Sequence, residues 1–342
     1  MTADDTAPIL ELRNLEVEFD TRAGTVHGLR GVSFAIRRGE TLALVGESGS
    51  GKSVTASAIM GLIQLPGAVT GGEILWKGQS LLGRAGERRA RRLRGREMSM
   101  VFQDPMTSLN PLMSIGSHLV EVQRRHMGLS RRAAAARGAE LLDAVGITEP
   151  HRRMGQFPHE LSGGMRQRVM IALAIACEPE LLIADEPTTA LDVTIQAQVL
   201  DLLSDLQRDM GLSILLITHD LGVVAGLCEQ VAVMYAGEIV ETGAADDIFD
   251  RARHPYTQGL IRSTPRLTDR SERLVSIDGA PPGLLHPPAG CAFEPRCPQS
   301  SERCRARPAL AAEPGRQGAF ACWNSTPSAW PEAAPGPKAS FA

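Results

Sequence analysis

The stretch Gly46–Ser53, GESGSGKS, decides the fold because it has the spacing G-x-x-x-x-G-K-[ST] at a predicted strand-to-helix junction. The residues before it, Thr41–Val45, are typical of a buried strand. Glycines let backbone N–H groups turn toward a phosphate, and the start of the following helix adds the positive end of its dipole. We therefore predict a phosphate-binding loop formed by Gly46, Glu47, Ser48, Gly49, Ser50, Gly51, Lys52 and Ser53.

The last two residues of this loop carry its side-chain chemistry. Lys52 is expected to bring a compact positive charge to the β and γ phosphates of a nucleotide, and Ser53 to offer a hydroxyl to Mg²⁺. The 36 basic residues of the chain include only three lysines, Lys52, Lys77 and Lys338. A composition bias explains that scarcity, so Lys52 is informative only together with its neighbours. The wide planar fork of arginine would fit an enclosed phosphate nest poorly.

Two acidic residues follow another predicted strand, in the segment Leu181–Pro187, LLIADEP. Asp185 is positioned to hold Mg²⁺ through water, and Glu186 to polarise an attacking water as a general base. His219 follows the next predicted strand, where a hydrogen bond to a γ-phosphate is geometrically sensible. The alternatives are a solvated strand end for the acids and a structural role for the histidine.

The order of these elements indicates an α/β core. Leu181–Ala184 and Ser213–Thr218 are predicted buried strands. Between them, Ile195–Met210 has apolar residues on one helical face and is followed by Gly211, a typical helix end. A strand–helix–strand unit of this kind implies a parallel sheet.

Two regions differ from this pattern. Residues 104–178 predict helices over Ser130–Val145 and Gly163–Cys177 and no strong strand, so we interpret them as a helical insertion. The segment 281–342 contains 12 of the 22 prolines and four of the six cysteines, too much proline for regular helices. It therefore needs another way to hold its shape.

The bulk properties narrow the class of protein. A net charge of −3 and an aromatic content of 4% argue against a nucleic-acid partner. The acidic start MTADDTAPIL is not typical of a signal peptide, and the longest apolar run, Val169–Cys177, is far shorter than a membrane span. We expect any membrane role to depend on a partner. Seven arginines within Arg84–Arg96 predict a solvated helix face or loop, with contact to anionic lipid or an acidic partner as the alternative.

The segment Leu161–Arg168, LSGGMRQR, supplies the discriminating motif. A serine and two glycines open an amphipathic helix and make a second exposed nest of amides, which one nucleotide on one chain does not need. At this point the sequence, over roughly residues 10–265, resembles an ATP-binding-cassette (ABC) ATPase. The phosphate loop alone is shared by many NTPase families, whereas LSGG is specific.

The resemblance implies the fold and its divisions. We expect an α/β P-loop NTPase, the ABC nucleotide-binding domain, with a RecA-like core formed by residues 1–103 and 179–265. Residues 104–178 would form the helical subdomain that carries LSGG, and 266–342 a small Cys/Pro-rich C-terminal extension.

The resemblance also implies roles for individual residues. The LSGG segment would complete the ATP site of an opposite subunit in a head-to-tail dimer, through Ser162, Gly163, Gly164 and Gln167. Gln103 matches the glutamine that contacts Mg²⁺ and the attacking water, and Asp192 matches a dimer-contact loop. His219 matches the switch histidine, and Phe19 is the candidate for stacking on adenine, with a core strand position as the alternative.

Four cysteines of the tail, Cys291, Cys297, Cys304 and Cys322, have the spacing C-x₅-C-x₆-C-x₁₇-C. They lack the C-x₂-C pairs of zinc ribbons and bacterial ferredoxins, so spacing alone leaves metal binding and four reduced thiols open. His254–Thr257, HPYT, and the cysteine tail resemble ATPases of the dipeptide/oligopeptide/nickel importer family. That resemblance implies a 4Fe–4S cluster on the four cysteines, with zinc or no metal as alternatives.

The family resemblance implies function and partners as well. The chain would be a peripheral ATPase subunit on the cytoplasmic face of the membrane that couples hydrolysis of ATP, with Mg²⁺, to import of dipeptides or oligopeptides. Its partners would be a second ABC ATPase, with a heterodimer favoured, two transmembrane permease subunits and an extracytoplasmic solute-binding protein. Nickel, glutathione or another small solute is an alternative cargo. The alternative class is a soluble ABC ATPase that acts in repair or translation. Such proteins typically carry a long coiled-coil insertion or a second cassette, and this sequence has neither.

Overall fold

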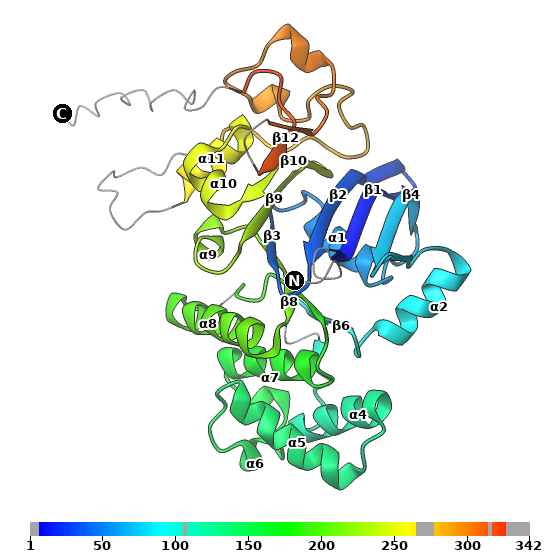
Figure 1. The fold of residues 1–342 in the computed structure, drawn as a ribbon, viewed down its shortest axis with the longest axis vertical. Coiled ribbons are helices and arrows are strands. Elements are labelled where there is room, and N and C mark those ends of the chain that lie inside the picture. The colour runs from blue at the N-terminus through cyan, green and yellow to red at the C-terminus, as the bar shows by residue number, and fades with distance from the viewer. Residues whose placement is uncertain (1–6, 105–107, 190, 265–276, 314–316, 326–342) are drawn as a thin grey trace, which may run out of the picture.

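The computed structural model describes residues 7–104, 108–189, 191–264, 277–313 and 317–325; Ala190 and Lys338 lie outside them. The body is built on two sheets (Figure 1). The four-stranded antiparallel sheet has the order β2 (Gly24–Arg37), β1 (Pro8–Thr21), β4 (Gly67–Trp76) and β5 (Gln79–Ser80). The eight-stranded sheet has the order β11 (Ala311–Ala312), β12 (Gly318–Phe320), β10 (Glu238–Ala244), β9 (Gln230–Tyr235), β3 (Thr41–Val45), β8 (Ser213–Thr218), β7 (Leu181–Asp185) and β6 (Met98–Val101).

The centre of the larger sheet is parallel, as the sequence predicts. β3 pairs in parallel with β8 and β9, and β7 pairs in parallel with β8 and β6. Every residue of β3, β7 and β8 is buried. Successive side chains of a strand face opposite ways, so Leu42 and Leu44 join the core shared with the smaller sheet, while Ala43 and Val45 join the core shared with the helices. Both faces of these strands are therefore covered.

Helices flank the sheet on the side of the second core. They are α8 (Val193–Met210), α9 (Leu221–Val224), α10 (Ala245–Arg251) and α11 (Pro255–Ser263). Two further helices, α1 (Lys52–Ile59) and α2 (Gly83–Leu93), pack on the side of the smaller sheet. The predicted helix between β7 and β8 is α8. It begins after Asp192, whose carboxylate caps the N–H of Ile195 at 3.0 Å, and it ends at Gly211 with φ 63°. α2 buries Gly86, Ala90 and Leu93 and turns most of its arginines to solvent.

Residues 108–178 form a helical lobe at the lower end of the molecule in Figure 1. It comprises α4 (Ile115–Met127), α5 (Arg131–Ala144), α6 (Pro150–Arg153), the 3₁₀ turn η1 (Pro158–Glu160) and α7 (Gly163–Ile175), and contains no strand within the described residues. α5 and α7 are slightly shorter than predicted, because Ser130 caps α5 from outside and the chain leaves α7 at Ala176. None of the described helices is long and apolar enough to cross a membrane.

The C-terminal lobe, residues 277–313 and 317–325, packs at the opposite end (Figure 1). As its proline content predicts, it has only the 3₁₀ turns η2 (Glu294–Arg296) and η3 (Glu302–Arg305) and the short strands β11 and β12. β12 extends the main sheet by pairing with β10. Phe293 of the lobe is buried against Tyr235 and Tyr256, with ring centroids 5.3 and 5.4 Å away. Strand pairing and aromatic packing thus hold in place a segment whose prolines prevent regular helices.

Next to this contact, His254 is buried as the N-terminal cap of α11. Its ring atom Nδ1 accepts the backbone N–H of Tyr256 at 3.1 Å, and the backbone N–H of His254 donates to the carboxylate of Glu241 at 2.9 Å. Burial lowers the pKa of His254 to about 3. The ring is therefore neutral in the folded protein.

This burial predicts a pH dependence of stability. An unfolded histidine has a pKa of about 6.5, so below that pH the unfolded chain binds a proton that the folded chain rejects, and the free energy of unfolding falls. Between pH 7 and pH 5 this amounts to about 2 kcal/mol. His254→Asn, whose oxygen can still cap Tyr256, should lose about 2 kcal/mol less than the wild type over this range, measured by urea unfolding. Equal losses in the two proteins would contradict the prediction.

Candidate active site

A cavity of about 650 Å³ opens at the carboxyl ends of the central strands. It brings together predicted site residues that are far apart in the sequence: Phe19, Glu47, Ser48, Gly49, Gly51, Lys52, Ser53, Gln103, Glu186 and His219 all line it. The other two residues of the loop, Gly46 and Ser50, do not line the cavity. Ser50 is buried, and its backbone N–H donates to the carbonyl of Glu47. In α/β proteins, ligands bind at this edge of the sheet.

The curvature of the loop requires glycine at its close contacts. Gly51 has φ 109°, and a Cβ there would lie 2.7 Å from Met234 Cε and 2.9 Å from Gly28 O. A Cβ at Gly46 would lie 2.2 Å from Met234 O. β9 therefore supports the loop from behind so closely that no side chain fits between them.

Lys52 begins α1 and points back into the loop. Its Nζ donates to the carbonyls of Gly46 and Glu47 at 2.8 and 3.0 Å, and only 5% of the residue is exposed. Burial lowers the pKa of Lys52, and the negative charges of Glu186, Asp185 and Glu47 oppose that shift. An ammonium shielded from water attracts an anion more strongly than an exposed one does.

Ser53 and Asp185 provide neighbouring oxygen atoms. Ser53 Oγ donates to Asp185 Oδ1 at 3.1 Å, and Asp185 is 5% exposed. Burial raises the pKa of Asp185, opposed by the hydrogen bond from Ser53. A hydroxyl and a carboxylate side by side are the hard oxygen ligands that Mg²⁺ takes, with water completing its octahedron. The pair therefore fits a magnesium site.

Glu186 is the most constrained acid in the site. It has φ 46°, a conformation rare for residues other than glycine and often found at functional positions. Its Oε2 accepts hydrogen bonds from Gln103 Nε2 and from Thr189 Oγ1, both at 2.9 Å, and its Oε1 lies 3.3 Å from His219 Nδ1. Three side chains thus fix the direction of this carboxylate.

Thr189 and Tyr256 are contacts that the sequence analysis missed. Thr189 follows Glu186 by three residues, so the segment EPTT carries a local signal for the first. The hydroxyl of Tyr256 accepts the N–H of Glu47 at 2.8 Å across 209 residues, and nothing local indicates it. Phe19 packs against Gly28 and Gly67 beside the cavity, consistent with either of the two roles considered for it.

The LSGG segment lies away from this cavity. Ser162 is exposed and caps α7 by accepting the N–H of Met165 at 3.3 Å; Gly163 is exposed too, and neither residue lines the cavity around Lys52. A Cβ at Gly164 would lie 2.8 Å from Ile195 of α8. Gln167 is only 2% exposed, on the buried face of α7 rather than at its open start.

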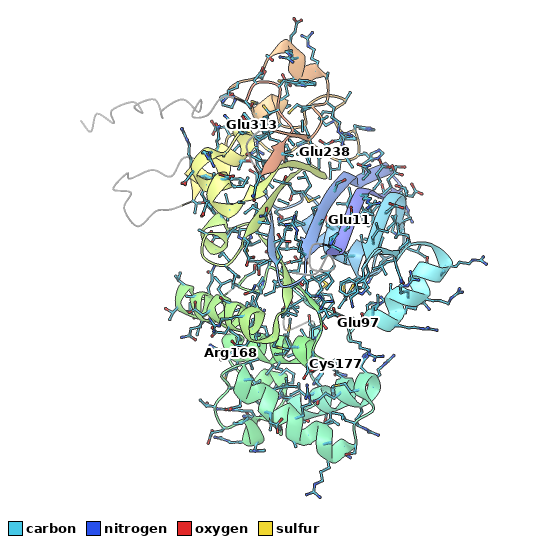
Figure 2. The ribbon with its side chains drawn as sticks, in the orientation of Figure 1. Glu11, Glu97, Arg168, Cys177, Glu238 and Glu313 are labelled. Carbon is cyan, nitrogen blue, oxygen red and sulfur yellow. The ribbon has the colours of Figure 1, made fainter. Side chains whose placement is uncertain are left out.

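The expectation of an iron–sulfur cluster on Cys291, Cys297, Cys304 and Cys322 is wrong. Within the described ranges, no group of three or more histidine, cysteine, aspartate or glutamate side chains is placed to hold a metal. All the cysteines are free, and Cys291 and Cys297 pack against the hydrophobic core. Burial raises the pKa of Cys291 to about 11 and that of Cys297 to about 12. Cys304 is buried as well, as are Cys177, labelled in Figure 2, and Cys228.

Known proteins resemble this chain over most of its length. It is 52% identical over 303 residues to the oligopeptide transport ATP-binding protein OppD of Haemophilus influenzae, covering 89% of this chain and 93% of that protein. It is 56% identical over 287 residues to OppD of Bacillus subtilis, covering 83% of this chain and 80% of the relative. A solved dimer of the ATP-binding cassette MJ0796 in a post-hydrolysis state, bound to ADP and Pi, superposes with a TM-score of 0.61 at 27% identity, covering 69% of this chain and 98% of that one.

The fold and the site define an ABC-type P-loop ATPase. Residues 29–189 match the family described as ABC transporter, and residues 240–304 match the oligopeptide/dipeptide transporter C-terminal region. The chain belongs to the ABC transporter family, among the ATP-binding proteins of oligopeptide and dipeptide transporters.

The close contact behind the loop predicts an effect of Gly51→Ala. Gly39, with φ 71° and no atom within 4 Å of a built Cβ, is the matched control. Both alanines bear the cost of a positive φ, about 1–2 kcal/mol, but only Gly51→Ala must also push Met234 away, about 1–3 kcal/mol more. Gly51→Ala should therefore unfold more easily and lose affinity for ATP, whereas Gly39→Ala keeps its affinity. Equal effects in urea unfolding and ATP titration would contradict the assignment.

Proposed function

We propose that this chain is the subunit that binds and hydrolyses ATP to drive import of dipeptides or oligopeptides through an ABC transporter. The observation that carries the ATPase chemistry is the convergence of Lys52, Ser53, Gln103 and Glu186 in one cavity, with Asp185 hydrogen-bonded to Ser53 behind it. The nearly full-length similarity to OppD proteins supports the peptide cargo.

Each side of the cavity has a task in this proposal. The amides of Gly46–Ser53 and the ammonium of Lys52 bind the phosphates of ATP, and Phe19 contacts the adenine base. When bound, Mg²⁺ would neutralise charge on the phosphates of ATP. Ser53, Gln103 and Asp185 would hold it, Asp185 through water. Burial of Lys52 and Asp185 strengthens their interactions because little water screens them.

Glu186 acts as the general base of hydrolysis. Its carboxylate accepts a proton from a water molecule that attacks the γ phosphorus in line, while the bond from that phosphorus to the β–γ bridging oxygen breaks and ADP leaves with the bonding electrons. Gln103 and Thr189 keep the carboxylate turned toward the cavity. His219 is more than half exposed and lies beside Glu186, where it can also bond the γ phosphate. The backbone of Glu186 has a strained, positive φ, and such strain is common where a side chain must point in one direction for function.

Two chains would share each ATP. Ser162 and Gly163 are exposed, and neither lines the cavity around Lys52 of their own chain. With Gly164 they would face the ATP of a second subunit, as suits a head-to-tail dimer. Asp192 caps α8 near this surface and would contact the partner. Gln167, on the buried face of α7, would then support the start of this helix from behind. We favour a related second ATPase as the partner, giving a heterodimer.

The rest of the transporter follows from this assignment. The chain would bind two transmembrane permease subunits on the cytoplasmic face of the membrane, with cargo delivered by an extracytoplasmic binding protein and no role for nucleic acid. We propose a RecA-like core of residues 1–103 and 179–265, a helical subdomain of residues 104–178, and an extension of residues 266–342 that is specific to this transporter group.

The role of Glu186 predicts the behaviour of Glu186→Gln. The amide cannot take a proton from water but keeps the shape of the side chain, so the variant should bind ATP as the wild type does while turnover falls at least about 100-fold. ATP titration and phosphate release in the assembled transporter measure the two quantities. Glu140→Gln, at an exposed position of α5, is the control and should change neither. Normal turnover by Glu186→Gln would contradict the mechanism.

The cargo is tested in vesicles that contain the purified transporter. Uptake of a labelled tripeptide should require ATP and its binding protein, and should stop in vesicles carrying Glu186→Gln. Mass spectrometry of the same complex identifies the second ATPase. ATP-dependent uptake of nickel without uptake of peptide would contradict the proposed cargo.

A further inference from the structure

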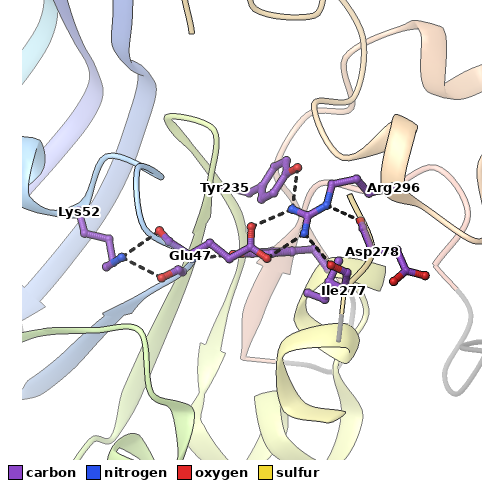
Figure 3. A network of polar contacts seen from close by, with 8 residues as sticks. Glu47, Lys52, Tyr235, Ile277, Asp278 and Arg296 are labelled. Atoms are coloured by element: carbon purple, nitrogen blue, oxygen red, sulfur yellow. Dashed lines mark hydrogen bonds and ion pairs between the residues drawn. The ribbon is translucent and has the colours of Figure 1, made fainter. Parts of the chain in front are cut away.

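Arg296, at the end of η2 in the C-terminal lobe, forms a two-pronged ion pair with Glu47 of the phosphate loop (Figure 3). Nη1 lies 2.7 Å from Oε2 of Glu47, and Nη2 lies 3.0 Å from Oε1. The two residues are 249 positions apart, and the Arg296 side chain is only 5% exposed. A bidentate arginine–carboxylate pair fixes both position and orientation.

The remaining donors of Arg296 are also used. Nε donates to the carbonyl of Asp278 at 2.9 Å, Nη2 to the carbonyl of Ile277 at 3.1 Å, and Nη1 to the hydroxyl of Tyr235 at 3.2 Å. The guanidinium thus makes five hydrogen bonds, one for each of its N–H groups. Burial alone would lower the pKa of Arg296, but the hydrogen bonds with Glu47 and Tyr235 outweigh it and raise that pKa. Lysine could not reproduce this set of contacts.

Glu47 passes this restraint on to the phosphate-binding groups. Its N–H donates to the hydroxyl of Tyr256 at 2.8 Å, and its carbonyl accepts Lys52 Nζ at 3.0 Å. Figure 3 shows Glu47 between Arg296 on one side and Lys52 on the other. A change in the position of Glu47 therefore moves a carbonyl that holds the lysine ammonium.

The same segment of the lobe reaches the cavity at a second point. Leu284 lines the cavity together with Phe19, and its carbonyl accepts the N–H of His27 at 2.9 Å. The chain between Ile277 and Arg296 thus borders the cavity near Phe19 and also holds the loop at Glu47. A lobe that only covered the core would not need both contacts.

We propose that Arg296 is a positioning residue for the ATP site, which holds the phosphate loop in its binding shape through Glu47. This inference rests on the proposed function, since it takes the cavity as the ATP site. The C-terminal lobe would then contribute directly to nucleotide binding. An ATP-binding core cut free of this lobe would have an incompletely held loop.

The test compares Arg296→Met and Arg296→Lys with the wild type. Equilibrium titration of Mg–ATP into the full-length chain gives Kd, and ATP hydrolysis by the assembled transporter gives KM and kcat. Arg296→Met should raise Kd and KM about tenfold, which corresponds to about 1.4 kcal/mol, with kcat at saturating ATP within about twofold of the wild type. Arg296→Lys keeps the charge but not the fork, and should recover only part of the affinity.

Arg253→Met is the matched control. Arg253 makes another two-pronged pair, with Glu313 at 3.0 and 2.6 Å, which also ties the C-terminal lobe to the core but away from the cavity (Glu313 is labelled in Figure 2). Loss of that pair should lower the melting temperature without changing Kd for ATP. An equal rise in Kd for Arg253→Met would reduce Arg296 to a general stabiliser of the lobe and overturn the proposal.

Glu47→Gln keeps the test decisive if Arg296→Met folds poorly. It should also raise Kd, and the double variant Glu47→Gln/Arg296→Met should bind ATP no more weakly than the worse single variant, because both changes remove the same contact. Additive effects, or a wild-type Kd in Arg296→Met, would overturn the proposal. Absence of ATP binding in the wild type would instead overturn the proposed function.

Discussion

The Lys52 ammonium is held by the carbonyls of Gly46 and Glu47 in a place where only 5% of the residue is exposed. Burying a charge is costly unless hydrogen bonds and opposite charges surround it. Several parts of the fold provide these surroundings. The parallel strands bring Asp185 and Glu186 to the same edge. β9 supports the loop so closely that Gly46 and Gly51 cannot carry side chains. Burial lowers the pKa of Lys52 and raises that of Asp185, so the protein interior disfavours both charges.

The sequence predicted those parts of the fold and the site that depend on short segments. β3 and β8 have the predicted bounds, and Lys52, Ser53, Gln103, Glu186 and His219 line one cavity. The strand ends made this possible, because residues that follow parallel strands meet at one edge of a sheet. The scarcity of lysine proved to be no guide by itself, since Lys77 also has partners, Glu97 and Glu180.

What the sequence could not predict depends on contacts between distant segments. Tyr256 and Arg296 reach Glu47 across 209 and 249 residues, and no spacing rule relates them. The resemblance that suggested a cluster rested on the order of the cysteines along the chain, which does not give the placement of each thiol in space. Nor does any local pattern bring together Tyr235, Tyr256 and Phe293, whose rings pack against one another and anchor the C-terminal lobe beside the loop.

The central claim is that the shape of the enclosed loop, and not positive charge alone, selects Lys52. The most direct test is the Kd of Mg–ATP for the full-length Lys52→Arg variant, with folding verified by its melting temperature. The account predicts a loss of affinity of about 100-fold or more, because the guanidinium cannot enter between the Gly46 and Glu47 carbonyls. A Kd equal to that of the wild type would contradict it.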